Sequence, residues 1–231
     1  MSKHLPYSII AVSIVLHGCG AGPFGSKLEE GTIEYALSFP DQDPNGLMGG
    51  MLPERTTLTF TSEKQVAELS AGMGIFRTAV ITDNVAKAMD YHMSMMSRKI
   101  VAHLQPRDLE NFVDRERPTI IHTNDLDTIA GFPCRKAIAI FSDISRPEVE
   151  LWYTDGICVR EPNWFGPFAE VPGVLLRYEM IQHGMRMRLD AISVTKGPVD
   201  ETKFIPKEEY QLVPATTLHN ELAEVLDTFK M

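Results

Sequence analysis

A methionine-rich segment in the middle of the chain carries side chains that could bind a metal ion. Residues 89–96 read MDYHMSMM, so thioether groups recur along the segment and the imidazole of His92 lies between them. Thioether and imidazole suit Cu(I), and one hypothesis is therefore a copper-binding protein. The other hypothesis is structural, because methionine also fills irregular apolar space in cores and cavities. We favour the second and expect no metal and no other cofactor.

The spacing in this segment is that of a strand, because alternate residues share a face. That face comprises Met89, Tyr91, Met93 and Met95. A later segment, residues 185–195, repeats the pattern, with charged side chains on its other face, as in a sheet with one solvated side. Its apolar face carries Met185, Met187 and Leu189. Together these seven side chains are predicted to line a pocket for an apolar ligand.

The three cysteines can be divided by position. Cys19 lies near the N-terminus, which leaves Cys134 and Cys158 as a pair for an oxidising compartment. Residues 133–142 and 148–158 are predicted to form a hairpin. If Ser142 pairs with Glu150, Cys134 lies opposite Cys158, close enough for a disulfide. We predict that disulfide. Two buried free thiols are the alternative, and a zinc site would lack ligands.

No sequence motif indicates an enzyme. The chain contains no G-x-S-x-G segment, no phosphate-binding glycine loop and no H-E-x-x-H segment, so we expect no catalytic residues. The histidines outside the signal region are scattered: His92, His103, His122, His183 and His219. A net charge of -9, without a block of basic residues, also argues against nucleic acid as a partner.

The N-terminal residues resemble a secretory signal. Lys3 and His4 precede an apolar run over residues 8–16, which is far shorter than the ~20 residues that span a bilayer. Residues 16–19, LHGC, then resemble a lipobox. This predicts cleavage after Gly18 and lipid on Cys19, where each buried methylene adds ~0.8 kcal/mol of membrane affinity. An ordinary secretory signal is the alternative.

The flexible segment GAGPFGS, residues 20–26, suits a tether between lipid and domain. The expected organisation is a signal peptide over residues 1–18, a lipidated tether over 19–30, a β domain over 31–214 and an amphipathic helix over 215–231. We expect an anchor in the outer membrane, with the protein facing the periplasm.

Most of the chain reads as short strands joined by turns. Alternation predicts strands over 31–39, 54–62, 64–70, 75–82, 88–104 (one or two strands), 133–142, 148–158, 174–183 and 185–195. Helical spacing occurs over 106–116 and 218–229. The predicted fold class is mainly β (α+β): a curled antiparallel sheet or half-barrel of about nine to eleven strands with one or two short helices.

Three segments carry a resemblance to a known family. They are IAGFPCRKA (129–137), WYTDGI (152–157) and VPGVLL (171–176), and in this order they resemble the GLPGLI family, with Val-Pro-Gly-Val in place of Leu-Pro-Gly-Leu. This family, or a sister group of Bacteroidota envelope lipoproteins, has no known function. The resemblance implies a distant similarity to the LolA and LolB half-barrels, whose concave apolar face holds acyl chains.

The predicted function is therefore a non-enzymatic envelope lipoprotein that is bound to the membrane by its N-terminal lipid and binds an apolar ligand or lipid. The first alternative is an interaction or scaffold module with a filled core and a binding surface on residues 40–53 or 164–172. The second alternative is the Cu(I)-binding periplasmic protein.

Overall fold

The computed structural model describes residues 27–43, 49–109, 112, 116–143, 146–182 and 184–227. The predicted signal peptide, the cleavage site at Gly18 and the lipidation site at Cys19 lie outside these residues. So does part of the segment 106–116, for which a helix was predicted. Within the described ranges, no helix has the length and apolar character needed to cross a membrane.

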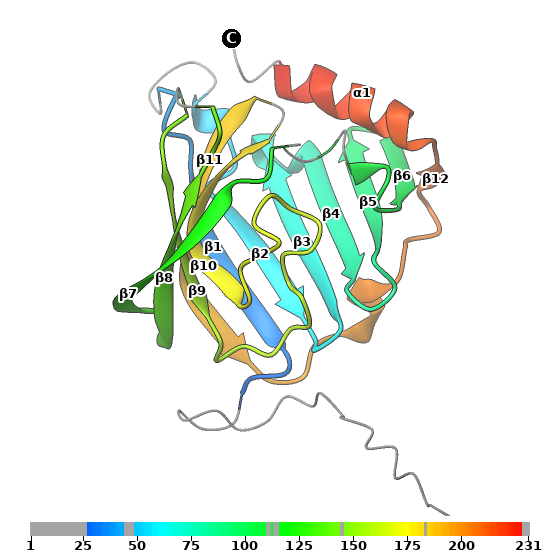
Figure 1. The fold of residues 1–231 in the computed structure, drawn as a ribbon. Helices are drawn as coiled ribbons and strands as arrows, with labels where there is room; N and C mark the ends of the chain where they lie inside the picture. The colour runs from blue at the N-terminus through cyan, green and yellow to red at the C-terminus, as the bar shows by residue number, and fades with distance from the viewer. Residues whose placement is uncertain are drawn as a thin grey trace, which may run out of the picture.

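Twelve strands form one sheet, in the order β12-β6-β5-β4-β3-β2-β1-β11-β10-β9-β8-β7, and the sheet curls without its end strands pairing (Figure 1). Neighbouring strands are antiparallel except β12 and β6, which are parallel. The strands are β1 (Gly31–Ser38), β2 (Arg55–Phe60), β3 (Lys64–Ala71), β4 (Phe76–Asp83), β5 (Ala88–Met95), β6 (Arg98–Leu104), β7 (Thr119–Ile129), β8 (Phe132–Ile140), β9 (Val149–Thr154), β10 (Val174–Gln182), β11 (Met185–Lys196) and β12 (Gln211–Leu212).

The predicted fold class is confirmed. The strand number exceeds the predicted range because the sequence pattern did not indicate β7 and β12. Strand β7 is mostly exposed, pairs only with β8, and contains an irregularity between His122 and Leu126, so it lacks the alternation that marks a half-buried strand. Strand β12 has two residues, too few for any periodicity.

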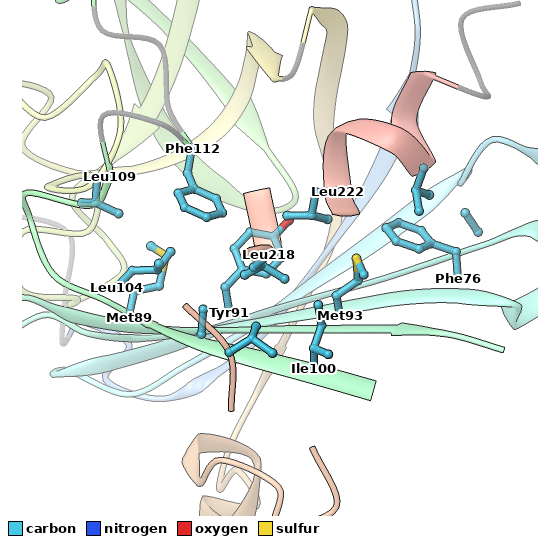
Figure 2. Packing of buried hydrophobic residues seen from close by; sticks show 14 of the residues in the cluster. Phe76, Met89, Tyr91, Met93, Ile100, Leu104, Leu109, Phe112, Leu218 and Leu222 are labelled. Atoms are coloured by element: carbon cyan, nitrogen blue, oxygen red, sulfur yellow. The ribbon is translucent and has the colours of Figure 1, made fainter. Parts of the chain in front are cut away.

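The concave side of the sheet is covered by two elements (Figure 1). Helix α1 (Ala215–Asp227), the predicted terminal helix, packs its buried residues Leu218, Leu222 and Val225 over β5 and β6. Figure 2 shows Leu218 and Leu222 beside Tyr91 and Met93. The second element is the segment 155–173 between β9 and β10, here called the cover segment.

The convex side is covered over a smaller area. Phe204, at the end of the 3-10 helix η4 (Glu201–Phe204), packs against Val66 and Ile81. Beyond it, Tyr210 lies edge-on to the buried ring of His92, with 4.9 Å between ring centroids. His92 therefore faces away from α1 and the cover segment.

The chain enters the sheet beside the base of the cover segment. Leu28 forms a parallel bridge with Ile157: the Leu28 amide donates to the Gly156 carbonyl (2.9 Å), and the Cys158 amide donates to the Leu28 carbonyl (2.8 Å). In Figure 1 this junction lies at the end of the sheet opposite α1.

The predicted disulfide between Cys134 and Cys158 is wrong. Cys134 is a free, buried thiol, whereas Cys158 is disulfide-bonded, so the two cysteines are not joined to each other. The reason is strand register. Ile138, not Ser142, pairs with Glu150, so the register differs from the predicted one by four residues. Strand β9 ends at Thr154, and Cys158 belongs to the cover segment instead.

Candidate functional site

A cavity of about 220 Å³ lies on the concave face of the sheet. Strands β1 to β5, β10 and β11 form its wall, and Pro162, Asn163 and Phe165 of the cover segment close one side. Leu109 and Phe112 border another part. The wall side chains are largely apolar, and they include Tyr35, Leu37, Leu58, Ala67, Leu69, Val80, Met89, Tyr91, Leu175, Tyr178, Met180, Met187 and Leu189.

Four of the seven residues predicted to form the ligand pocket line this cavity: Met89, Tyr91, Met187 and Leu189. Met185 lines a smaller cavity of about 60 Å³, beside Leu222 and Leu226 of α1. Met93, only 1% exposed, belongs to the core beneath α1, and Met95 packs against the same core. The two predicted faces are thus on the same side of the sheet, but α1 fills the space over part of them.

Four side-chain or backbone contacts hold the cover segment against the sheet. Gln65 on β3 donates from Nε2 to the Pro162 carbonyl (3.0 Å), and the Trp164 indole donates to Asn84 Oδ1 (3.0 Å). The Arg160 amide donates to the Ser62 carbonyl (2.8 Å). In addition, Lys87 forms an ion pair with Glu161. These contacts fix one end of the cover segment to β3 and to the β2–β3 and β4–β5 turns.

Asn163 holds the cover segment in its folded form. Its Nδ2 donates to the carbonyls of Val171 and Gly173, each at 2.9 Å, and so joins the start of the segment to its end. Phe168 and Val171 between them are buried. Trp164 and Phe165 are half-buried, and Glu170 and Pro172 are exposed, so a binding surface on residues 164–172 stays a prediction.

The tyrosines of the cavity stay protonated across the physiological range. Burial raises the pKa of Tyr91 and of Tyr178 to about 12 in each case. The Tyr35 hydroxyl donates to the Leu175 carbonyl (2.8 Å). Tyr178 packs edge-on against Tyr35 and Phe168, with 6.4 Å between centroids in both pairs. These groups act as neutral hydrogen-bonding groups in a largely apolar wall.

The side chains proposed for copper do not converge. His92 lies on the opposite face of β5 from Met89 and Met93, so the imidazole and these thioethers cannot bind one ion. Across the part of the chain that the structure describes, no three His, Cys, Asp or Glu side chains are grouped to hold a metal ion. His103 pairs with Asp90 on that same outer face of β5, away from the cavity.

The sequence pattern did not predict several of the residues that line the cavity. Tyr35 and Leu37 lie in the predicted strand 31–39, but nothing in the sequence placed that strand beside Met89. Gln65 is a buried polar residue in β3, and its contacts with Asn84 and Pro162 depend on the tertiary fold. The aromatic residues Trp164, Phe165 and Phe168 within a loop were the one local signal of a covering segment.

Comparisons with known proteins report on the fold. No protein-family model matches the sequence, and no curated protein matches it. A solved structure of PNGF-II is similar to this chain, with a TM-score of 0.54 and 14% identity over 85% of the chain. The match covers 33% of PNGF-II, so this chain spans about a third of the length of that protein. At this identity the similarity concerns the fold alone.

Two other solved structures are less similar. MucB in complex with MucA(peri) has a TM-score of 0.33 and 11% identity, and the match covers 80% of this chain and 57% of that one. A beta-barrel-like protein of a domain of unknown function from Brucella abortus has a TM-score of 0.35 and 8% identity, with 74% and 99% covered. The curled sheet implied by the GLPGLI resemblance is present, and membership of that family stays a prediction.

Proposed function

We propose that this protein is a non-enzymatic lipoprotein of the cell envelope that holds an apolar molecule on the concave face of its sheet. The observation that carries the proposal is the cavity between the sheet and the cover segment. A sheet with a filled core, as the scaffold alternative requires, would leave no such space. The distant similarity to LolA and LolB half-barrels, implied by the sequence resemblance, agrees with this role.

The volume limits the size of the ligand. An apolar cavity of about 150 Å³ can bind benzene, whereas pockets for drug-sized ligands measure about 300–1,000 Å³. At about 220 Å³, the cavity lies between these values. It therefore suits a short chain or two to three rings, or a single acyl tail in part, and not a lipid with several chains.

The binding test uses the full chain carrying Cys19→Ser, exported without lipid so that no detergent is needed. Binding is followed with the neutral fluorescent probe N-phenylnaphthylamine. Ala67 lines the cavity on β3, and Ala67→Phe should weaken probe binding at least tenfold by filling the space. The control is Ala36→Phe on β1: Ala36 lies between Tyr35 and Leu37, which line the cavity, so its side chain points to the other face.

The proposal would be rejected if the unsubstituted cavity bound no probe and organic extraction of the protein released no ligand. Equal binding by Ala67→Phe and Ala36→Phe would also contradict it, provided that circular dichroism shows both variants to be folded. In that case the probe would be binding elsewhere on the surface.

The membrane anchor is a separate part of the proposal. Lipid on Cys19 would occupy the sulfur of that cysteine, so a lipidated Cys19 could form no disulfide. We expect the lipid in cells, with anchoring in the outer membrane. Mass spectrometry of protein from native membranes decides the question: an N-terminal peptide with acyl mass supports the anchor, and a peptide linked from Cys19 to Cys158 refutes it.

A further inference from the structure

The cavity wall lacks charge. Among the described residues that line it, there is no Asp, Glu, Lys, Arg or His. In the chain as a whole 23% of residues are charged, so the charges are kept apart from this wall. Its polar groups are hydroxyls and amides, chiefly on Gln65, Thr78, Asn163, Tyr178 and Gln182.

Strand geometry accounts for the absence of charge. Successive side chains of a strand point to opposite faces, and the charged residues of the wall strands occupy the outer positions. Glu68, between Ala67 and Leu69, forms an ion pair with Lys203 at 2.7 Å. On β10 and β11, Arg177 pairs with Asp190 at 2.7 Å. These charges are paired on the far side of the sheet and are not available to a ligand.

Several polar groups of the wall are already hydrogen-bonded within the protein. The amide nitrogens of Gln65 and Asn163 each donate to backbone carbonyls, and the Tyr35 hydroxyl donates to Leu175. No hydrogen bond joins the hydroxyl of Tyr178, which also lines the cavity, to a side chain or backbone group of the described residues. A ligand group that can form a hydrogen bond would satisfy it.

An ionised ligand group would be destabilised in such a cavity. It would lose its hydration shell and gain no opposite charge, and the cost of burying an unpaired charge exceeds that of any neutral polar group. An uncharged hydroxyl, ester or amide would lose far less and could bond with Tyr178.

We infer that the ligand is an uncharged amphiphile, such as an alcohol or ester with a short apolar chain, and that the cavity rejects the ionised acid of the same chain. This inference rests on the proposed function and narrows it to a ligand class. It distinguishes neutral amphiphiles from fatty acid anions and from phospholipid headgroups.

The test compares octanol with octanoate as competitors of bound N-phenylnaphthylamine, with the full chain carrying Cys19→Ser. These molecules have equal chain length and are small enough to enter the cavity whole. Near pH 7, where a carboxylic acid is ionised, octanol should bind at least tenfold more tightly than octanoate. As the pH falls toward about 5, the neutral acid accumulates, and the apparent affinity of octanoic acid should rise while that of octanol stays constant.

A matched pair of variants tests the wall itself. Ala67→Asp should weaken octanol binding at least tenfold relative to Ala67→Asn, which has nearly the same size and no charge, and acidification should reduce this difference. Tyr178→Phe, which removes only the hydroxyl, should weaken octanol about fivefold, as expected for one lost hydrogen bond.

The outcomes separate the inference from the proposed function. If octanoate binds as tightly as octanol near pH 7, and its affinity does not change with pH, the inference is overturned. The proposed binding of apolar ligands would still stand. Probe binding that neither competitor reduces also overturns it, because the ligand class would be wrong. If the probe itself does not bind, the proposed function fails first. If the Ala67 variants do not fold, the comparison of octanol with octanoate in the protein with Ala67 unchanged still tests the inference.

Discussion

Replacing Asn163 by Asp should open the cover segment. The two side chains have the same shape, but the carboxylate has no donor for the carbonyls of Val171 and Gly173, which now accept at 2.9 Å. Two hydrogen bonds of about 1 kcal/mol each are lost, and charge repulsion from two carbonyl oxygens adds to the loss. We expect the closed form of the segment to lose about 2 kcal/mol, roughly a 30-fold shift toward open forms.

Amide hydrogen exchange measures this shift directly, because protection of a locally opening segment follows its opening free energy. Amides that are hydrogen-bonded within the cover segment, such as that of Val171, should exchange roughly 30-fold faster in Asn163→Asp, while those of β4 and β5 keep their rates. Acidification below the pKa of the new carboxyl should restore part of the protection, because the protonated acid can donate once. Glu170→Gln, a charge change at an exposed position of the same segment, is the control. Unchanged exchange in Asn163→Asp would refute the view that these bonds hold the segment closed.

Two further predictions concern stability. A Cβ at Gly173 would lie 2.4 Å from the carbonyl oxygen of Thr154, which belongs to strand β9 and cannot easily move. Gly173→Ala should therefore lower the free energy of unfolding, measured by chemical denaturation, by about 1–3 kcal/mol. Gly50→Ala, with no atom within 4 Å of the added carbon, should lower it far less, and equal losses in the two variants would contradict the packing argument. Burial raises the pKa of the Cys134 thiol from 9.0 to about 11, so the unfolded chain loses this proton first and the free energy of unfolding should fall as the pH rises from about 9 toward 11, by about 2 kcal/mol in total. Cys134→Ala should flatten the fall between about pH 9 and 10, and an identical slope in both proteins would show that the thiol is not its source.

The sequence predicts most of this fold because most strands have one buried and one solvated face. Alternation in β1 and β11 located these strands to within a residue or two, and the apolar spacing of Leu218 and Leu222 located α1. Strand β7 gave no such signal, since both of its faces are largely exposed. Its place in the sheet is determined by pairing with β8, and this pairing belongs to the tertiary structure and not to the local sequence pattern.

Register was the part that local reasoning could not determine. A shift of two or four residues keeps each side chain on its face, so the hydrophobic pattern was the same for the predicted and the observed pairing of β8 with β9. The apparent match of Cys134 with Cys158 then suggested the wrong register. The observed pairing places Lys136 opposite Trp152 and leaves Cys158 beyond the end of the strand.

The candidate site was predicted in outline for a similar reason. Periodicity identified Met89, Tyr91, Met187 and Leu189 as one apolar surface, but it could not show what covers each part of that surface. Met93 lies beneath α1, whereas Met89, four residues earlier on β5, borders the cavity. This difference depends on where the helix ends and the cover segment begins.

The bridge between Leu28 and Ile157 also places the cover segment in a mechanical path. A pulling force on the N-terminal side of the domain is carried first by the two hydrogen bonds that Leu28 makes with Gly156 and Cys158, and only then by β1. The force would therefore act at the base of the cover segment, while α1, at the far end of the sheet, would carry little of it (Figure 1). Tension applied at that end would thus reach the cover segment before the strands of the sheet.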